Sequence, residues 1–110
     1  MKNVNEEIEL TYNDLNIALE TAAEYYKGAT RIGHALSKHA GRKPEIWGKI
    51  EGTMRNWHEQ AMRHFKDIYH GPGKFVRVTT PKGISFLEKR LPDGRGIRLN
   101  LNYTFKGFID

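Results

Sequence analysis

The hydrophobic periodicity of this chain changes at Gly71-Pro72-Gly73, and that change limits its fold more than any other feature. Before this stop signal, apolar residues recur at three- and four-residue spacing, the pattern of an α-helix with one buried face. After it, short runs of alternating apolar and polar residues are separated by turn signals, as in antiparallel strands. The sequence therefore predicts an α+β fold in which N-terminal helices pack on a C-terminal antiparallel β-sheet.

The bounds of the expected elements come from local start and stop signals. Thr11 or Asn13 caps the first helix, and Thr30 caps the second. Gly41 is expected to break the second helix, and Pro44 marks a loop or the start of a further helix. The helices are expected at about residues 11–28, 30–39 and 53–69, and the strands at about residues 74–80, 84–90, 96–101 and 103–109.

Length and composition favour one domain without covalent cross-links. The 110 residues are 38% apolar and include no cysteine, so a single modest core must form without disulfides or thiolate metal ligands. No stretch is long and apolar enough to span a membrane, and polar residues, not the apolar run of a signal peptide, follow Lys2. We expect one domain over 1–110, with an acidic helical segment at 1–28, frayed at 1–9, and a basic core at 29–110.

Charge is unevenly distributed along the chain. The first 26 residues carry six acidic side chains and one basic side chain, whereas residues 27–110 carry 17 basic and seven acidic side chains. With a formal net charge of +5, this segregation favours a polyanionic partner. Nucleic acid is the first such partner to consider, and an anionic membrane surface or an acidic protein is the second. A basic protein with no such partner stays open as the plainer interpretation.

The most concentrated chemistry lies in GHALSKHAGR, residues 33–42, which holds His34, Lys38, His39 and Arg42. Cleavage of RNA without a metal ion needs a base for the 2′-hydroxyl, an acid for the leaving 5′-oxygen, and donors that hold the phosphorane. Histidine serves as acid or base near neutral pH, and arginine suits phosphate contact. The residues alone leave open whether His39 is catalytic or part of a solvated helix end, and whether His34 is structural.

The closing strands supply a second group of candidates. In GIRLNL, Arg98 and Asn100 lie on the polar face of the expected strand, and Thr104 follows in the last strand. These side chains would hold a phosphate if the sheet lies beside His39, although Arg98 could equally face solvent. Three further cations flank a turn and are either backbone-phosphate contacts or solubilising charges: Lys89, Arg90 and Arg95.

No histidine spacing in the sequence matches a helical metal site. His34 and His39 are five residues apart and His58 and His64 are six apart, so neither pair stacks two ligands on one helical face. His58 and His64 lie on or beside an apolar helical face, so packing or surface roles are expected for them. We therefore predict no metal and no small-molecule cofactor.

The order of segments resembles a known family. LSKHAGR is followed by WGKIEG, a long helix and closing strands that end GRGIRLNLNYTFKGFID. Over about residues 30–110 this is similar to the ribonuclease-type toxic C-terminal domains of bacterial contact-dependent growth inhibition proteins, which share a fold with barnase, the EndoU enzymes and the colicin D and RelE toxins. Colicin D-like nucleases carry a similar Lys-His-Ala segment with a catalytic histidine, which corresponds here to Lys38-His39-Ala40.

The resemblance implies a transfer-RNA endonuclease that works without metal and leaves a 2′,3′-cyclic phosphate. It implies tRNA and a cognate immunity protein as partners, the latter acidic and covering the basic site, with elongation factor Tu as a candidate protein cofactor. The folded domain is expected to be a monomer that does not bind membranes. It would be secreted as part of a large surface effector and delivered into the target-cell cytoplasm, and Met1 suggests an expressed piece of such a longer protein.

This interpretation assigns a catalytic role to His39, Lys38, Arg98 and Thr104, and substrate binding to His34, Arg42, Asn100, Lys89, Arg90 and Arg95. The closing strands hold no second histidine, so a second acid or base must come from Lys38, His34 or a polar strand residue. The acidic N-terminal helix lies outside the resemblance and is a candidate docking element. The competing hypotheses are a non-catalytic basic nucleic-acid-binding module and a protein-interaction domain that uses the acidic helix.

Overall fold

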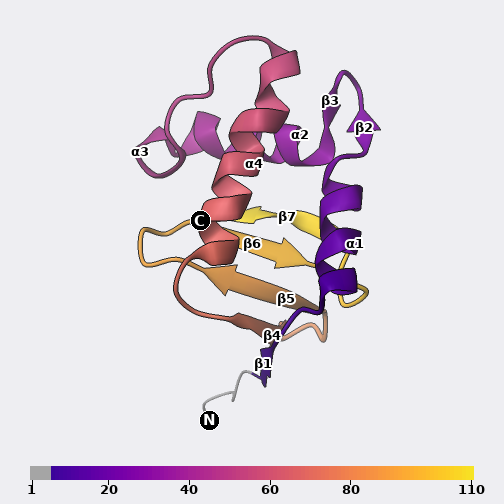
Figure 1. Ribbon diagram of the computed structural model, residues 1–110. Helices are drawn as coiled ribbons and strands as arrows, with labels where there is room; N and C mark the ends of the chain where they lie inside the picture. Colours follow the sequence, from indigo (N-terminus) through magenta and orange to yellow (C-terminus); the bar gives the residue numbers. More distant parts are fainter. Residues whose placement is uncertain (1–5) are drawn as a thin grey trace.

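The boundary between helices and sheet lies at the predicted position. The computed structural model describes residues 6–110 and has the α+β architecture expected from the sequence (Figure 1). In chain order the elements are β1 (Glu6–Ile8), α1 (Tyr12–Ala22), β2 (Tyr25–Tyr26), β3 (Ala29–Thr30), α2 (Arg31–Arg42), α3 (Pro44–Trp47), α4 (Met54–His70), β4 (Phe75–Thr79), β5 (Ser85–Arg90), β6 (Gly96–Leu99) and β7 (Phe105–Ile109).

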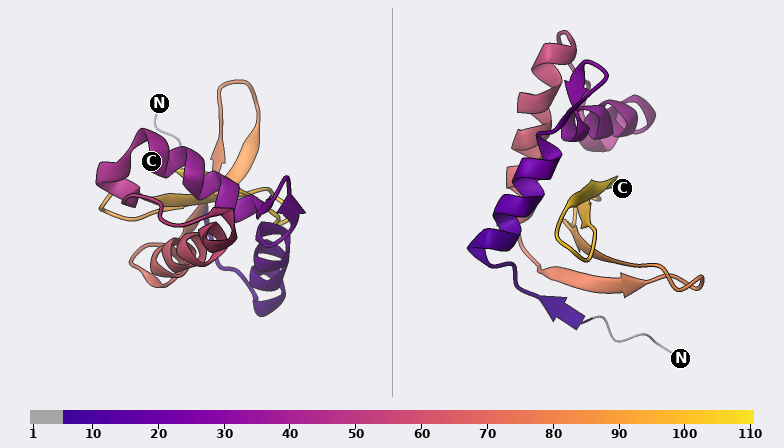
Figure 2. Two further views of the ribbon diagram at one scale, coloured as in Figure 1. Left: turned by 90° about the horizontal axis from the view of Figure 1, so that it is seen from above. Right: turned by 90° about the vertical axis from the view of Figure 1, so that its right-hand side faces the viewer.

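The main sheet has five strands in the order β1-β4-β5-β6-β7, and every neighbouring pair is antiparallel. β2 and β3 form a separate two-stranded hairpin. Figure 2 shows α1 and α4 on the same side of the sheet, with α2 lying across its β7 end. Among the helices of residues 6–110, none is long and apolar enough to cross a membrane.

α1 and α2 begin at the predicted caps, but they do not end at the predicted positions. Thr11 and Thr30 cap α1 and α2, as expected. α1 ends at Ala22, earlier than predicted, because the chain turns into the β2–β3 hairpin. Gly41 does not break α2, which continues to Arg42 and ends where Pro44 disfavours a helical conformation of the preceding residue.

The N-terminal prediction was wrong in part. Residues 6–8 were expected to be frayed, but they form β1, which pairs with β4 at the sheet edge. Residues 1–5 of the same expectation lie outside the described residues. The third strand also ends two residues before its predicted end, because residues 100–104 form a turn into β7.

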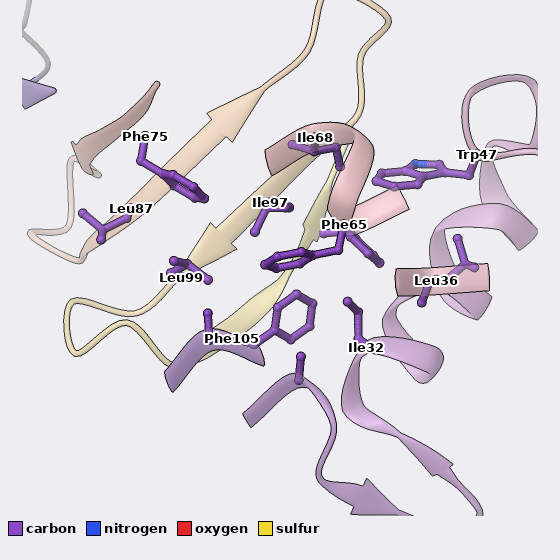
Figure 3. Close-up of a cluster of buried hydrophobic side chains, with 14 of the residues drawn as sticks. Ile32, Leu36, Trp47, Phe65, Ile68, Phe75, Leu87, Ile97, Leu99 and Phe105 are labelled. Atoms are coloured by element: carbon purple, nitrogen blue, oxygen red, sulfur yellow. The ribbon is translucent and has the colours of Figure 1, made fainter. Parts of the chain in front are cut away.

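The core lies between α2, α4 and the inner face of the sheet (Figure 3). Phe65 of α4 and Leu36 of α2 are both at most 2% exposed. They face sheet residues such as Ile97 and Leu99, which are fully buried. Burial of this shared apolar surface holds α2 against β7 and fixes the position of every side chain that α2 presents to the sheet edge.

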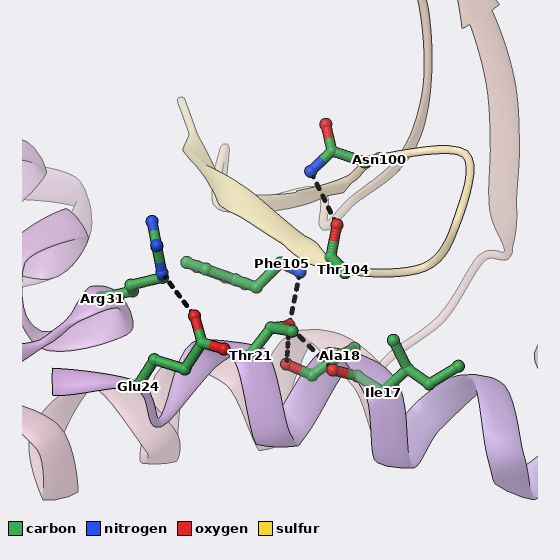
Figure 4. A network of polar contacts seen from close by, with 8 residues as sticks. All are labelled: Ile17, Ala18, Thr21, Glu24, Arg31, Asn100, Thr104 and Phe105. Carbon is green, nitrogen blue, oxygen red and sulfur yellow. Dashed lines mark hydrogen bonds and ion pairs between the residues drawn. The ribbon is translucent and has the colours of Figure 1, made fainter.

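The start of β7 is held by a side chain of α1 (Figure 4). The Thr21 hydroxyl accepts a hydrogen bond of 2.8 Å from the Phe105 backbone N–H and donates to the carbonyl of Ile17 at 2.7 Å. This contact gives a partner to a backbone donor at the end of an edge strand. The position of β7 therefore depends on a side chain of α1.

Lys89 has a structural position and does not lie on the substrate surface to which the sequence assigned it. Its side chain is on the helix-facing side of β5, is only 5% exposed, and donates 2.7 Å and 3.0 Å hydrogen bonds to the carbonyls of Tyr69 and Gly71. Those carbonyls lie at the C-terminal end of α4, where the helix leaves acceptors without intrahelical partners. Burial lowers the pKa of the Lys89 ammonium. The lysine therefore joins the sheet to α4.

Substitution Lys89→Met is expected to lower the free energy of unfolding by about 1–3 kcal/mol, because two partly buried carbonyls lose their donor. Urea unfolding of the purified protein measures this change. The matched control is Lys74→Met, which removes an exposed lysine paired with Glu9 and should leave the unfolding midpoint nearly unchanged. A Lys89 variant as stable as the wild type would contradict the structural role.

Candidate active site

A groove of about 490 Å³ runs between α2 and β7. The contributing α2 residues recur at three- and four-residue spacing, so they form one face of the helix. Among residues 6–110, none that lines the groove is acidic, so the groove favours an anionic ligand. The lining residues are Tyr26, Arg31, His34, Ala35, Lys38, His39, Arg42, Phe105, Lys106, Gly107 and Phe108.

His39 is oriented by a carboxylate from the far end of the chain. Its Nδ1 lies 2.6 Å from Oδ2 of Asp110, and the indole Nε1 of Trp47 donates a 2.8 Å hydrogen bond to the same oxygen. The carboxylate accepts from Nδ1–H, which selects the ring tautomer whose Nε2 can accept a proton. The side chains of His39 and Asp110 are 13% and 15% exposed, so this pair is largely shielded from water.

The surroundings keep Asp110 ionised. Burial alone would raise the pKa of the Asp110 carboxyl, but hydrogen bonds from His39 and Trp47, together with the nearby charge of Lys43, outweigh burial and hold that pKa below its usual value. An ionised Asp110 stabilises the positive ring that forms when His39 takes up a proton. The pair can therefore perform proton transfer beside a groove that is lined by cations.

Trp47 is in turn held by a second group of polar residues. Its ring packs edge-on against His64 with ring centroids 5.2 Å apart. Arg95 donates to Nδ1 of His64 at 2.9 Å, to Asp67 at 3.2 Å and to Asp93 at 2.8 Å. The sequence assigned Arg95 to substrate binding, but its guanidinium is only 14% exposed and serves this internal network.

Acid is expected to destabilise the fold in two stages. Burial and the charge of Arg95 lower the pKa of His64 below its ordinary 6.5, and the pKa of Asp110 lies below 3.8. Because both folded-state pKa values are depressed, the stability that these groups contribute is complete above those ordinary values and is lost as pH falls through each folded-state pKa. Urea unfolding between pH 4 and pH 8 should show the loss that begins below about pH 6.5. His64→Gln should abolish that stage, whereas an unchanged pH dependence in this variant would contradict its assignment.

The structure brings together the candidates from α2. His34, Lys38, His39 and Arg42 all line the groove. A ring nitrogen of His34 bonds the backbone carbonyl of Tyr26, so His34 also has the structural role that the sequence left open. The segment 33–42 therefore supplies one wall of the site, as its residue types suggested.

Arg98 and Arg90 lie on the sheet face opposite the core, where both bond Glu88 through their Nε atoms at 2.8 Å. Neither lines the groove. Arg98 nevertheless lies near it, because the Arg98 guanidinium and the Lys106 ammonium lie 4.4 Å and 5.9 Å from the ring centroid of Phe86. Arg98 thus lies close to a groove cation without entering the groove itself.

Thr104 and Asn100 serve the β6–β7 turn and do not line the groove. The Asn100 amide donates a 2.9 Å hydrogen bond to the Thr104 hydroxyl (Figure 4). That hydroxyl donates in turn to the Asn102 side-chain oxygen at 2.6 Å. These bonds close a turn whose Tyr103 has a positive φ of 72°. The sequence placed both residues at a phosphate because regular strands were expected at positions where the chain forms a turn.

Sequence reasoning missed four polar residues of the groove or the dyad: Asp110, Lys106, Arg31 and Tyr26. Lys106 lies at a β-bulge, because Arg98 pairs with Gly107 and Leu99 pairs with Phe105, which leaves one extra residue in β7. Such bulges redirect side chains, often beside active sites. No local sequence pattern indicates the bulge or the pairing of Asp110 with His39.

Comparisons with known proteins identify the family of this chain. The family model for the CdiA C-terminal tRNase toxin domain matches residues 19–110. The toxic C-terminal tip of CdiA from Pseudomonas aeruginosa, solved in complex with an immune protein, is 67% identical in sequence, with 83% of this chain and 99% of that chain covered and a TM-score of 0.81. A comparison with curated proteins finds no match. The chain therefore belongs to the family of CdiA C-terminal tRNase toxin domains.

Proposed function

We propose that this tRNase cleaves its substrate at the α2–β7 groove, without a metal ion, and leaves a 2′,3′-cyclic phosphate. The observation that carries the proposal is the hydrogen bond between His39 and Asp110 beside a groove lined by cations and no carboxylate. A histidine oriented in this way provides proton transfer, and the cations provide phosphate binding.

In the proposed reaction, Nε2 of neutral His39 takes the proton of the 2′-hydroxyl. The 2′-oxygen forms a bond to phosphorus, and the bond from phosphorus to the 5′-oxygen breaks. The ammonium of Lys38 donates a proton to that leaving oxygen. Arg42 and Lys106 line the same groove and hold the negative charge of the phosphorane. Arg98 is paired with Glu88 outside the groove, so we assign no catalytic step to Arg98 or to Thr104.

The family supports proposals about the partners and the delivery of this domain. We propose that a cognate immunity protein neutralises this domain, as the Pseudomonas aeruginosa relative is bound to an immune protein. An acidic immunity protein that covers the groove would match the excess of cations there. As a CdiA C-terminal domain, the chain is a toxin of a surface effector, and we propose that it is delivered into the cytoplasm of the target cell as a monomer.

The test is cleavage of total bacterial tRNA by the purified domain in EDTA. We expect discrete fragments whose 3′ ends resist phosphatase until the cyclic phosphate is opened. Cleavage that requires an added divalent cation, or products with free 3′-hydroxyls, would overturn the proposed chemistry.

A second arm of the test supplies aminoacylated tRNA with elongation factor Tu and GTP. Cleavage only in this arm would assign the factor as a protein cofactor, and cleavage in both would make it dispensable. Intact tRNA in both arms would contradict the proposed site chemistry and favour a binding module.

A further inference from the structure

We propose that Tyr26 is a stacking platform for an unpaired base of the RNA next to the cleaved phosphate. This inference rests on the proposed function of the α2–β7 groove and adds a specificity element to it. It begins from the β2–β3 hairpin, which precedes α2 and which no step of the reaction uses.

The hairpin holds Tyr26 in a fixed position. Its two turn residues, Lys27 and Gly28, have positive φ angles of 51° and 90°, as in the tight turns that fit paired strands. Tyr26 pairs with Ala29 across this turn, and its carbonyl is bonded by the ring of His34 in α2. The backbone of Tyr26 is thus tied both to the hairpin and to the helix that carries His39.

The ring of Tyr26, in contrast, is open to solvent at the groove. The residue is 55% exposed although it lines the groove. Its aromatic neighbour is His34, with ring centroids 5.9 Å apart in an edge arrangement, and the Lys27 ammonium lies 5.2 Å from the ring centroid. The Lys27 ammonium lies over the ring, so Tyr26 is a half-exposed aromatic ring next to a cation. Proteins bind single-stranded nucleic acid with such aromatic and cationic side chains, because every base has a face that can stack.

The distance along α2 matches the proposed role. His34, which contacts Tyr26, precedes His39 by five residues, a rise of about 7.5 Å along the helix axis. A strand laid along the groove with its reacting phosphate at His39 therefore brings the neighbouring nucleotide to Tyr26. Arg31, one turn further along α2, extends the same wall. Stacking at Tyr26 would favour an unpaired nucleotide beside the cleaved bond, as in a loop or at a single-stranded end.

Binding is tested with a short 2′-O-methyl oligoribonucleotide of mixed sequence, which lacks the reactive 2′-hydroxyl, so the measurement does not depend on catalysis. Tyr26→Leu should weaken binding about five- to tenfold, the lower range for loss of one base–aromatic stack. Tyr26→Phe should bind like the wild type because the ring is retained. Tyr12→Leu is the matched control, since Tyr12 is 79% exposed but does not line the groove.

Cleavage kinetics separate this inference from the proposed chemistry. Tyr26→Leu should raise KM with little change in kcat, whereas loss of a proton-transfer group lowers kcat. The platform is wrong if Tyr26→Leu binds the oligonucleotide like the wild type, or if Tyr12→Leu weakens binding equally. It is also wrong if Tyr26→Leu reduces affinity only for the immunity protein, in which case Tyr26 belongs to a protein interface.

Discussion

Replacement of His39 by alanine is expected to lower the rate of tRNA cleavage about 10²- to 10⁴-fold, the usual range for loss of a general acid–base group. The reason is that His39 is the groove residue whose ring is oriented by a carboxylate. Single-turnover cleavage of tRNA by the purified variant measures the effect, with tRNA affinity determined in parallel. We expect affinity to change little, because the groove keeps its four cations, Arg31, Lys38, Arg42 and Lys106.

Two further variants sharpen this prediction. His39→Gln keeps a side-chain donor for Asp110 but cannot shuttle a proton near neutral pH, so it should be as inactive as His39→Ala. His70→Ala removes an exposed histidine at the end of α4, outside the groove, and should cleave at the wild-type rate. An active His39→Gln variant would show that the ring does no proton transfer.

Asp110→Asn is expected to reduce kcat about 10²- to 10⁴-fold, because an amide neither fixes the productive tautomer of His39 nor stabilises its positive form. The pH profile of kcat should change with it, since the carboxylate acts through the ring that transfers the proton. Asp14→Asn is the matched control, because Asp14 caps α1 and does not line the groove.

The double variant tests whether the two residues act as a unit. If they do, His39→Ala combined with Asp110→Asn should cost about as much as His39→Ala alone, because the carboxylate has no role without the ring. Fully additive losses, or a wild-type kcat for Asp110→Asn, would contradict the dyad.

The fold was largely predictable from the sequence because its main signals are local. The period change at Gly71-Pro72-Gly73 and the caps at Thr11 and Thr30 act within a few residues, and all three are confirmed. β1 was not predictable, because three residues carry no usable periodicity and the strand exists through its pairing with β4.

The candidate site was predictable only on one of its two walls. His34, Lys38, His39 and Arg42 are linked by three- and four-residue steps along α2, so their proximity follows from helix geometry. The other wall depends on tertiary packing and on a β-bulge at Lys106. Charge near a turn was also misleading, because it cannot show which face of a strand is buried.

Lys89 illustrates the last point, since its neighbours in sequence are polar while its surroundings in space are the end of α4. Its ammonium points toward the helices because side chains alternate between the two faces of β5. Asn100 and Thr104 show the reverse case, in which an apparently continuous strand pattern hides a turn.

The hydrogen bond between His39 and Asp110 joins residues 71 positions apart, which has a consequence for how the domain acquires activity. Contacts of such long sequence separation form late in folding, because the intervening chain must first lose much of its freedom. A chain with folded helices but an undocked β7 therefore has no assembled dyad. Enzyme activity should appear during refolding with the slowest long-range step, so a chain that crosses a membrane unfolded would be harmless to RNA until its last strand is in place.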